Sequence, residues 1–442
     1  MTQEEEIAQL RAENHALQEQ LRTALARIAE LEGQKVLPSF VKANTAKHRE
    51  KRAKKARKNR QAEENGVRRR EEPTQIVEHR LETCPDCRGR LSALMLARRR
   101  QVIELPAPPR LEVIEHQIYK GWCSYCRQWK QAGVDLGGQV LGQSRLSSGI
   151  ASLIAYLRTI LRLPIRQIQQ YLRTLHGLTL SVGEVVEVLH HVERVTRPAL
   201  KALQAEVRSS AVVHMDETGW REDGRNGYIW SASTPHGVRY YEYHHSRAGP
   251  IGETLLGPSF KGVLISDFYG AYNDYACPHQ RCWVHLLRDL HDLKKEQAQE
   301  PSVVQWAQEI KGIFAHAQES KQRGTGSQDY AGLVAQAKAV AARYAQQKKH
   351  PCQAVAKRLL RHQDELFQFV LRPEVAADNN LAERSIRPLV VLRKISGGSR
   401  SPQGSQTGMA LASLFGTWQA KGLDALEQCR LLLSQQTPLP QP

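Results

Sequence analysis

The amino-acid sequence predicts a multidomain protein of the mixed α/β class. The chain has 442 residues, more than one domain usually contains, and hydrophobic residues make up 41% of it. Residues 140–205 and 296–375 have the apolar spacing of amphipathic helices. Residues 206–295 instead contain short apolar runs separated by glycine and proline, which indicate strands. We therefore expect a sheet-containing core and two helical regions.

The net charge indicates a polyanionic partner. The chain carries 63 Lys and Arg against 45 Asp and Glu, a formal charge of +18. Nucleic acid is the leading candidate for such a partner, and the alternative is a basic protein without one. No apolar run approaches the roughly 20 residues of a membrane span. We therefore expect nucleic acid, and no membrane, among the partners.

The N-terminus and the cysteines bear on the cellular compartment. The first residues, MTQEEEIAQLRAENHALQEQ, are acidic and polar, unlike a signal peptide. The eight cysteines are accordingly expected to be reduced thiols, some of them bound to metal, rather than disulfides. We expect a cytoplasmic protein that associates with the nucleoid.

Residues 1–33 are predicted to form a leucine-zipper-like coiled coil that ends at Gly33. The seam positions alternate at spacings of three and four over four heptads: Ile7, Leu10, Asn14, Leu17, Leu21, Ala24, Ile28 and Leu31. Asn14 occupies an a position, where a buried asparagine fixes the register of a dimer. We expect a homodimer or higher oligomer through this helix. The alternative is an amphipathic helix that packs on its own domain.

A strongly basic segment follows over residues 34–72. Such runs contact phosphates without reading the base sequence, so a DNA-binding arm is expected, with a bare linker as the alternative. The expected DNA contacts are Lys51, Arg52, Lys54, Lys55, Arg57 and Lys58.

Residues 73–135 contain the pairs CPDC and CSYC, which predict a structural zinc ribbon. Cys84, Cys87, Cys123 and Cys126 would supply four thiolates to one tetrahedral Zn²⁺. The spacer exceeds the usual length, and its segment VIELPAPPRLEVIEHQIYK has the pattern of a strand, a proline turn and a second strand. Redox catalysis is the weaker alternative, because two separated pairs favour a closed structural site.

The region 140–205 is predicted to contain a helix-turn-helix-like unit. LPIRQIQQYLRTLHG is expected to be a helix that ends at Gly177, and Ser181 and Glu184 have the spacing of a capping box that opens the next helix. A helix, a short turn and a capped helix can read DNA, although any helical hairpin has the same pattern.

Two strands of the core are predicted to end in an acid. AVVHMD ends at Asp216, before a turn at Thr218 and Gly219, and GVLISD ends at Asp267. YIWSAST and VRYYEYHH lie between them as further strands. Carboxylates at neighbouring strand ends can bind Mg²⁺ or Mn²⁺ through oxygen ligands. The alternative is that each aspartate caps the turn that follows it.

A third acid, Glu383, lies in the segment ADNNLAERSIRP and has three possible roles. With Asn380 as the N-cap it would complete a capping box, and with Arg387 it would form an i, i+4 ion pair. With Asp378 or Asn379 as the cap, its carboxylate is free to join the two aspartates at a metal site.

The sequence after Glu383 predicts the end of the core. Pro388 is expected to break or kink the helix, and the glycine-rich SGGSRSPQGSQTG is expected to be a loop. Residues 401–442 would then form a C-terminal helix and a flexible tail.

Four segments, in this order, resemble the insertion-sequence-66 family of bacterial transposases: HMDETGWR, LISDFYGAY, RCWVHLLRDL and DNNLAERSIRPLVVLRKISGGS. The zipper-like start, the paired CxxC and the helical region also match that family's arrangement, so the resemblance covers nearly the whole chain. The DETGW and DNN-x-AER-x-x-RP motifs are specific, whereas the zipper and basic run are not. Phe268, Trp283 and Val284 stand where the family more often has smaller residues.

The resemblance implies a ribonuclease-H-like catalytic core preceded by a coiled coil, a zinc ribbon and a helical DNA-binding region. This core would comprise residues 206–295 and 376–400, interrupted by a helical insertion over residues 296–375. In such folds the first acid lies on the first strand, the second just after the fourth strand, and the glutamate on a later helix.

The resemblance also implies a DDE-type transposase with Asp216, Asp267 and Glu383 as catalytic acids. These acids would hold Mg²⁺ or Mn²⁺ for strand cleavage at the ends of an insertion sequence and for strand transfer into target DNA, so double-stranded DNA is the implied partner. Small accessory proteins of the same element are possible partners. The cations expected to contact DNA phosphates near the third acid are Arg384, Arg387, Arg393, Lys394 and Arg400.

Two other functions remain open at the level of the sequence. A zinc-containing dimeric DNA-binding regulator would use the acids only as caps, and a structure-specific nuclease on the same fold would cleave without joining. Cys282 and His285 form a CxxH pair for which packing or hydrogen bonding beside the second aspartate strand is favoured over a metal site.

Overall fold

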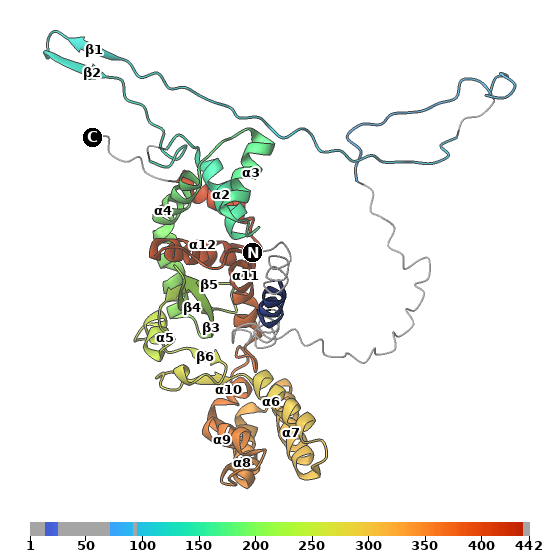
Figure 1. Ribbon diagram of the computed structural model, residues 1–442, viewed down its shortest axis with the longest axis vertical. Coiled ribbons are helices and arrows are strands. Elements are labelled where there is room, and N and C mark those ends of the chain that lie inside the picture. The colour runs from blue at the N-terminus through green and yellow to red at the C-terminus, as the bar shows by residue number, and fades with distance from the viewer. Residues whose placement is uncertain (1–13, 25–70, 92–94, 143, 436–442) are drawn as a thin grey trace, which may run out of the picture. The chain divides into compact units, whose positions relative to one another are not determined.

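The computed structural model describes residues 14–24, 71–91, 95–142 and 144–435 (Figure 1). The chain divides into two compact units, residues 1–105 and 106–442, and each is described by itself. Within the described ranges, no helix is both long and apolar enough to cross a lipid bilayer.

The first unit contains part of the predicted coiled coil and one cysteine pair. Residues 14–24 are helical, and the seam residues Leu17 and Leu21 are exposed. The other seam positions and the basic arm with Lys51, Arg52, Lys54, Lys55, Arg57 and Lys58 lie outside the described residues. The coiled coil and the arm therefore stay predictions.

The second unit begins with a short hairpin. Strand β1 (Lys120–Cys123) pairs antiparallel with β2 (Gln128–Gln131), and Trp122 lies opposite Trp129. The strand–turn–strand expected over the preceding spacer is wrong, because residues 95–119 form no strand. Its apolar side chains, such as Val102 and Val113, are exposed and have no neighbouring strand to pair with.

Three helices follow: α2 (Ser148–Thr159), α3 (Ile165–His176) and α4 (Val182–Ser209). The predicted stop of α3 at Gly177 is confirmed, since this glycine adopts the left-handed conformation at φ 73°. The capping box of α4 is also confirmed: Ser181 accepts from the Glu184 N–H, and the Glu184 carboxylate accepts from the Ser181 N–H.

A five-stranded sheet forms the centre of the second unit, with the order β5-β4-β3-β6-β7. Strands β3, β4 and β5 are antiparallel neighbours, and β6 and β7 run parallel to β3. The strands are β3 (Val212–Glu222), β4 (Arg225–Ser233), β5 (Arg239–His244), β6 (Val263–Ser266) and β7 (His279–Arg281). Between β5 and β7 lie the helix α5 (Gly249–Leu256) and the short 3₁₀ helix η2 (Gly270–Tyr272).

Strand β3 corrects the predicted position of the first turn. The strand does not stop at Asp216 but continues to Glu222, and the hairpin turns at Asp223 and Gly224, both with positive φ. Thr218 and Gly219 pair with β4 instead of turning the chain. The polar motif DETGW did not predict this continuation, because its residues pair with β4 beyond the part of β3 that is parallel to β6.

Helices α6 to α10 pack around an apolar core that includes Trp283 and Trp306 and that continues to Val212, Val263 and Ile265 of the sheet. The helices are α6 (Trp283–Glu296), α7 (Pro301–Arg323), α8 (Gly326–Ala345), α9 (Gln353–Arg361) and α10 (Gln368–Leu371), with the 3₁₀ helix η3 (Gln363–Glu365) before the last. The region expected to be helical is therefore helical, but residues 353–371 are divided into α9, η3 and α10.

The chain returns to the sheet through α11 (Asn380–Ser396), which packs on β3 and β4. Pro388 does not end this helix, which runs a further two turns to Ser396. The long α12 (Pro402–Ala420) packs on β5 and α4, and α13 (Ala425–Ser434) packs on α2 (Figure 1). The predicted glycine-rich loop is shorter than expected, because Ser401 caps α12 by accepting from the Gly404 N–H.

Candidate active site

Asp216 and Asp267 lie equally far beyond the last parallel pair of two adjacent strands. This pair is His214 of β3 with Ile265 of β6; Asp216 lies two residues further within β3, and Asp267 lies two residues further, directly after the end of β6. Neighbouring strands are about 4.8 Å apart, and side chains two residues apart point to the same face. This register favours a position of both carboxylates at the same end of the two strands.

Asn379 fixes the start of α11 beside the first acid. Its side-chain amide donates to the carbonyl of Met215 (2.7 Å), and its side-chain oxygen lies 3.2 Å from Nδ1 of His214. Its backbone N–H donates to Sγ of Cys282 (3.2 Å). Because Asn379 is almost fully buried, these bonds hold α11 in one position relative to β3.

Glu383 lies in the first turn of α11, and its carboxylate does not cap the helix. Its backbone N–H donates to the carbonyl of Asn379, whereas the Asn380 N–H is capped by the carboxylate of Asp378 (2.9 Å). Oε1 of Glu383 is buried, has no hydrogen-bond partner among the described residues, and lies 3.6 Å from Nε2 of His285. The capping-box role is therefore excluded.

The acids influence one another electrostatically. Burial, followed by the negative charges of Glu217 and Asp267, raises the pKa of Asp216 to about 7, and the charge of Glu383 acts in the same direction. Asp267 and Glu383 are therefore both within electrostatic reach of Asp216. A cation among them would relieve this repulsion.

The turn-capping alternative applies to Asp267 but not to Asp216, because β3 continues past Asp216 without a turn. Oδ1 of Asp216 accepts from the Glu217 N–H (2.9 Å), and Oδ1 of Asp267 accepts from the Tyr269 N–H (2.8 Å). Each bond uses one carboxylate oxygen, so the second oxygen of each aspartate stays available for a ligand.

Glu217, which directly follows the first acid, is a residue that the sequence reasoning missed. Its side chain is buried, accepts from Nε of Arg247 (2.9 Å) and accepts from the hydroxyl of Tyr272 (2.5 Å). Arg247 also stacks on the ring of Tyr269 at 3.8 Å. This network ties β3 to the loop after Asp267. The only sequence signal was a second acid within DETGW.

Arg281 holds the backbone of the second acid, and the sequence did not predict this role. Its fully buried guanidinium donates to the carbonyl of Asp267 (2.8 Å) and to Oε2 of Glu365 (2.5 Å). Burial alone would raise the pKa of Glu365, but its contacts with His362 and Arg281 lower that pKa to about 2. Glu365 belongs to η3, so the helical insertion is linked directly to the loop that presents Asp267.

Cys282 and His285 take structural positions beside the acids. The thiol of Cys282 accepts the Asn379 N–H, and burial raises its pKa, which keeps it protonated. His285 faces Glu383, and its Nδ1 is buried without a hydrogen-bond partner among the described residues. Cys282 of the CxxH pair is thus engaged in a hydrogen bond, and His285 lies beside the third acid.

The chemistry of the site fits a divalent cation. Oε1 of Glu383 is buried and has no partner among the described residues, whereas buried polar atoms normally have one. Hard oxygen ligands of this kind suit Mg²⁺ or Mn²⁺. Within the described ranges, no three His, Cys, Asp or Glu side chains are close enough to form a ready-made metal centre. A cation would therefore have to draw the carboxylates together.

Four of the five cations predicted near the third acid are exposed: Arg384, Arg387, Lys394 and Arg400. The fifth, Arg393, is half-buried and donates to the carbonyl of Gly219 and to the hydroxyl of Thr218 (3.3 Å). Arg393 therefore joins α11 to β3, and this role competes with a contact to phosphate.

Each cysteine pair forms its own turn. The Arg88 N–H donates to the carbonyl of Cys84, and hydrogen bonds from the backbones of Cys87 and Asp86 lower the pKa of the Cys84 thiol. The Cys126 N–H lies 3.4 Å from Sγ of Cys123, and it lowers the pKa of that thiol. Both turns thus favour thiolates, the form that binds zinc.

Comparisons with known proteins address both parts of the chain. A family profile described as "Transposase IS66 family" matches residues 143–407, more than half of the chain. A second, described as "zinc-finger binding domain of transposase IS66", matches residues 82–127, which include all four cysteines of the predicted ribbon.

Two curated relatives come from Sinorhizobium fredii, and both are named only as uncharacterized proteins. The protein y4qI is 26% identical over 223 residues, which cover 46% of this chain and 41% of y4qI. The protein y4jO is 28% identical over 171 residues, which cover 38% of this chain and 50% of y4jO. The matches thus span half or less of each relative. On the profile that matches residues 143–407, the chain belongs to the IS66 family of transposases.

Proposed function

We propose that this chain is a DNA transposase of the DDE type, with Asp216, Asp267 and Glu383 as the metal-binding catalytic acids. The observation that supports the proposal most is the register of β3 and β6: each aspartate lies two residues beyond the last parallel pair, His214 with Ile265, and the charge of Glu383 acts on Asp216. The reaction would be strand cleavage at the ends of an insertion sequence, followed by strand transfer into target DNA.

The three acids would hold one or two Mg²⁺ or Mn²⁺ ions, which when bound activate the attacking oxygen and stabilise the leaving oxygen of an in-line displacement. The protein's own residues position this site. Asn379 holds α11 against β3, and Arg281 holds the loop of Asp267. Exposed Arg384 and Arg387, on the same helix as Glu383, are placed to neutralise DNA phosphates.

A ribonuclease-H-like core is part of the proposal. Its support is the strand order β5-β4-β3-β6-β7 with three antiparallel strands followed by two parallel ones. The first acid lies on the first strand of this sheet, the second directly after the fourth, and the glutamate on a helix that follows a long helical insertion.

The remaining parts are proposed to bind and pair DNA ends. The family match over residues 82–127 supports a structural Zn²⁺ on Cys84, Cys87, Cys123 and Cys126. A coiled coil over residues 1–33 would join two protomers, and the basic arm would contact phosphates. Small accessory proteins of the same element are possible partners, and a transposase with these substrates would act in the cytoplasm at the nucleoid.

The direct test is a strand-transfer assay with DNA that carries the ends of the element. The wild-type protein is expected to nick and join DNA only with Mg²⁺ or Mn²⁺, and Asp216→Asn, Asp267→Asn and Glu383→Gln are each expected to lower both activities by at least about a hundredfold. Wild-type activity in all three variants would refute the proposal.

The same assay separates the alternatives. Cleavage without joining indicates a structure-specific nuclease on the same fold. Normal DNA binding without any metal-dependent nicking indicates a regulator. Asp274→Asn, an exposed aspartate after η2, is the matched control and is expected to retain full activity.

A further inference from the structure

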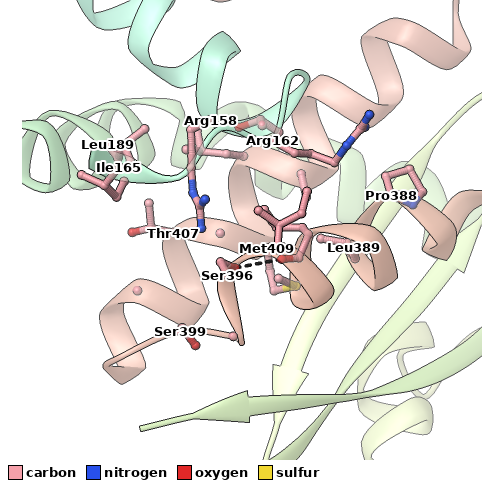
Figure 2. A pocket seen from close by; sticks show the side chains of 18 of the residues that line it. Arg158, Arg162, Ile165, Leu189, Pro388, Leu389, Ser396, Ser399, Thr407 and Met409 are labelled. Carbon is pink, nitrogen blue, oxygen red and sulfur yellow. Dashed lines mark hydrogen bonds between the residues drawn. The ribbon is translucent and has the colours of Figure 1, made fainter. Parts of the chain in front are cut away.

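A cavity of about 480 Å³ lies on the second half of α11, away from the three acids. It is bounded by the connection between α2 and α3, by α4, by the loop after α11 and by α12. Figure 2 shows Leu189 and Ile165 on one side and Leu389, Pro388 and Met409 on the other. This volume lies within the range of sites that bind small molecules.

The lining of the cavity combines apolar side chains with neutral polar groups and cations. Aliphatic residues alternate with serines, threonines and a glutamine, and no described aspartate or glutamate lines it. The groups that can carry positive charge are Arg158, Arg162, Arg400 and His190. An apolar hollow with arginines and no acid suits a ligand that combines an apolar body with an anionic group.

Arg158 is the cation that enters the cavity most directly. Figure 2 shows its side chain extending from the end of α2 toward Thr407 of α12. Its guanidinium donates to the carbonyl of Leu163 (3.1 Å) and makes no ion pair with any described residue. Burial lowers its pKa, because no anion compensates the desolvated charge. The remaining donors of Arg158 are therefore open to an anionic partner.

The walls of the cavity are held in place by the fold. Nδ1 of the buried His190 lies 2.7 Å from the hydroxyl of Thr407, which joins α4 to α12. The loop is tied to β3 because the Ser399 N–H donates to the carbonyl of Arg221 (2.9 Å) and the Ser399 hydroxyl accepts from the indole of Trp220 (3.0 Å). The site is therefore preformed.

The cavity shares helix α11 with the third acid, where DNA is proposed to bind. Leu392 and Ser396 line it, and both lie on the same helix as Glu383. Glu383 and Leu392 are nine positions apart, which corresponds to roughly 14 Å along the axis and about half a turn round it, so the cavity lies on the face of α11 opposite Glu383. A DNA strand bound at the acids would cross α11 to reach the cavity, a path of a few nucleotides.

We propose that this cavity accepts one unpaired nucleotide of a DNA strand, with the base against the apolar walls and a phosphate at Arg158, Arg162 or Arg400. This proposal rests on the proposed function only in taking DNA as the substrate. Proteins that extrude a base enclose it in such a pocket, and the contacts offset the cost of unstacking. The base would be held away from the cleavage site, so that it marks the position of the strand.

The test uses duplex DNA with a single 2-aminopurine opposite an abasic site, and a fully paired 2-aminopurine duplex as the reference. Both are titrated with the full-length protein without added divalent cation, so no cleavage is required. The wild-type protein is expected to bind the unpaired probe roughly tenfold more tightly than the paired one and to change its fluorescence several-fold.

Two variants of the pocket are expected to abolish this preference. Gly408→Leu narrows the cavity that Gly408 lines: a Cβ at this helical position meets no atom within 4 Å, and urea unfolding is expected to show that the variant keeps its fold. Arg158→Gln removes the charge. The matched controls are Gly332→Leu, an exposed glycine of α8 whose Cβ also meets nothing within 4 Å, and Arg430→Gln, an exposed arginine of α13. Both controls are expected to keep the preference.

Photocrosslinking locates the base. An unpaired 5-iodouracil is expected to crosslink to residues of the cavity such as Met409 or His190. Equal binding of paired and unpaired probes, an unchanged preference in Gly408→Leu, or crosslinks outside the cavity would overturn the proposal. Micromolar binding of free deoxyadenosine monophosphate without a preference for unpaired DNA would also overturn it. These results do not depend on strand transfer, so the inference and the proposed function fail separately.

Discussion

The side chain of Asn379 donates a hydrogen bond of 2.7 Å to the carbonyl of Met215, the residue that precedes the first acid. This bond links a helix and a strand that are more than 150 positions apart in the sequence. It therefore sets where Glu383, one turn into α11, lies relative to Asp216.

Asn379→Ala is expected to lower stability and activity together. The substitution leaves the Met215 carbonyl and His214 without their partner in a buried position, which costs about 2 kcal/mol of unfolding free energy. Urea unfolding measures this cost, and nicking assays are expected to show a larger loss than the stability change explains. Thr254→Ala, an exposed position in α5, is expected to change neither. Full nicking activity in Asn379→Ala would argue against a positioning role.

Arg247→Met is expected to destabilise the protein through Glu217. Glu217 is buried and Arg247 is its only ionic partner among the described residues, so the variant leaves a desolvated carboxylate. Because the arginine is partly exposed, we expect a loss of about 2 kcal/mol rather than the larger cost of a fully buried pair. The double variant Glu217→Gln with Arg247→Met is expected to recover part of that stability in urea unfolding. If the double variant recovers no stability, the loss in Arg247→Met comes from packing and not from the unpaired carboxylate of Glu217.

Asp216→Asn is expected to stabilise the protein at pH 8 in the absence of divalent cations. The folded-state pKa of about 7 lies above the ordinary value of 3.8, so the folded protein holds this proton more tightly than the unfolded chain. Stability from this group is present below about pH 4 and is lost as the pH rises through 7. The variant removes that loss, with a gain on the order of 2 kcal/mol at pH 8 and little change at pH 4.

Denaturant unfolding at the two pH values measures this difference. The exposed control Asp274→Asn is expected to show no gain at either pH. A destabilised Asp216→Asn at pH 8 would mean that the carboxylate is held by favourable contacts, contrary to the repulsion inferred here.

Each of the four ribbon cysteines is expected to be required for zinc. The protein as purified is expected to contain one Zn²⁺ per chain by elemental analysis, and serine at Cys84, Cys87, Cys123 or Cys126 is expected to remove it. Cys277→Ser is the control, since burial raises the pKa of that thiol and no zinc loss is expected. Retention of zinc in any of the four variants would exclude a four-cysteine site.

Much of the helical architecture was predictable because local signals agree with the fold. Gly177 and the Ser181–Glu184 capping box define the ends of α3 and α4 through bonds within a few residues. The apolar spacing of the insertion likewise predicted its helices. These features depend on neighbouring residues, which the sequence displays directly.

The parts that the sequence did not predict depend on distant partners. Strand β3 continues past Asp216 because β4 pairs with it, and Pro388 stays within α11 because the helix packs on β3 and β4. The three acids were identified from their motifs. The contacts of Glu217 with Arg247 and of Arg281 with Glu365 join segments separated by 30 or more residues, so no local sequence pattern predicts them.

The central claim is that Asp216, Asp267 and Glu383 share one cation site, and iron-directed cleavage of the backbone tests it most directly. Fe²⁺ replaces Mg²⁺ at such sites and, with ascorbate and peroxide, cuts the chain next to its ligands. We predict fragments that end near residues 216, 267 and 383, suppressed by excess Mg²⁺ and absent from the triple variant Asp216→Asn, Asp267→Asn, Glu383→Gln. Cuts at only one of these positions, or cuts that excess Mg²⁺ does not suppress, would contradict the claim.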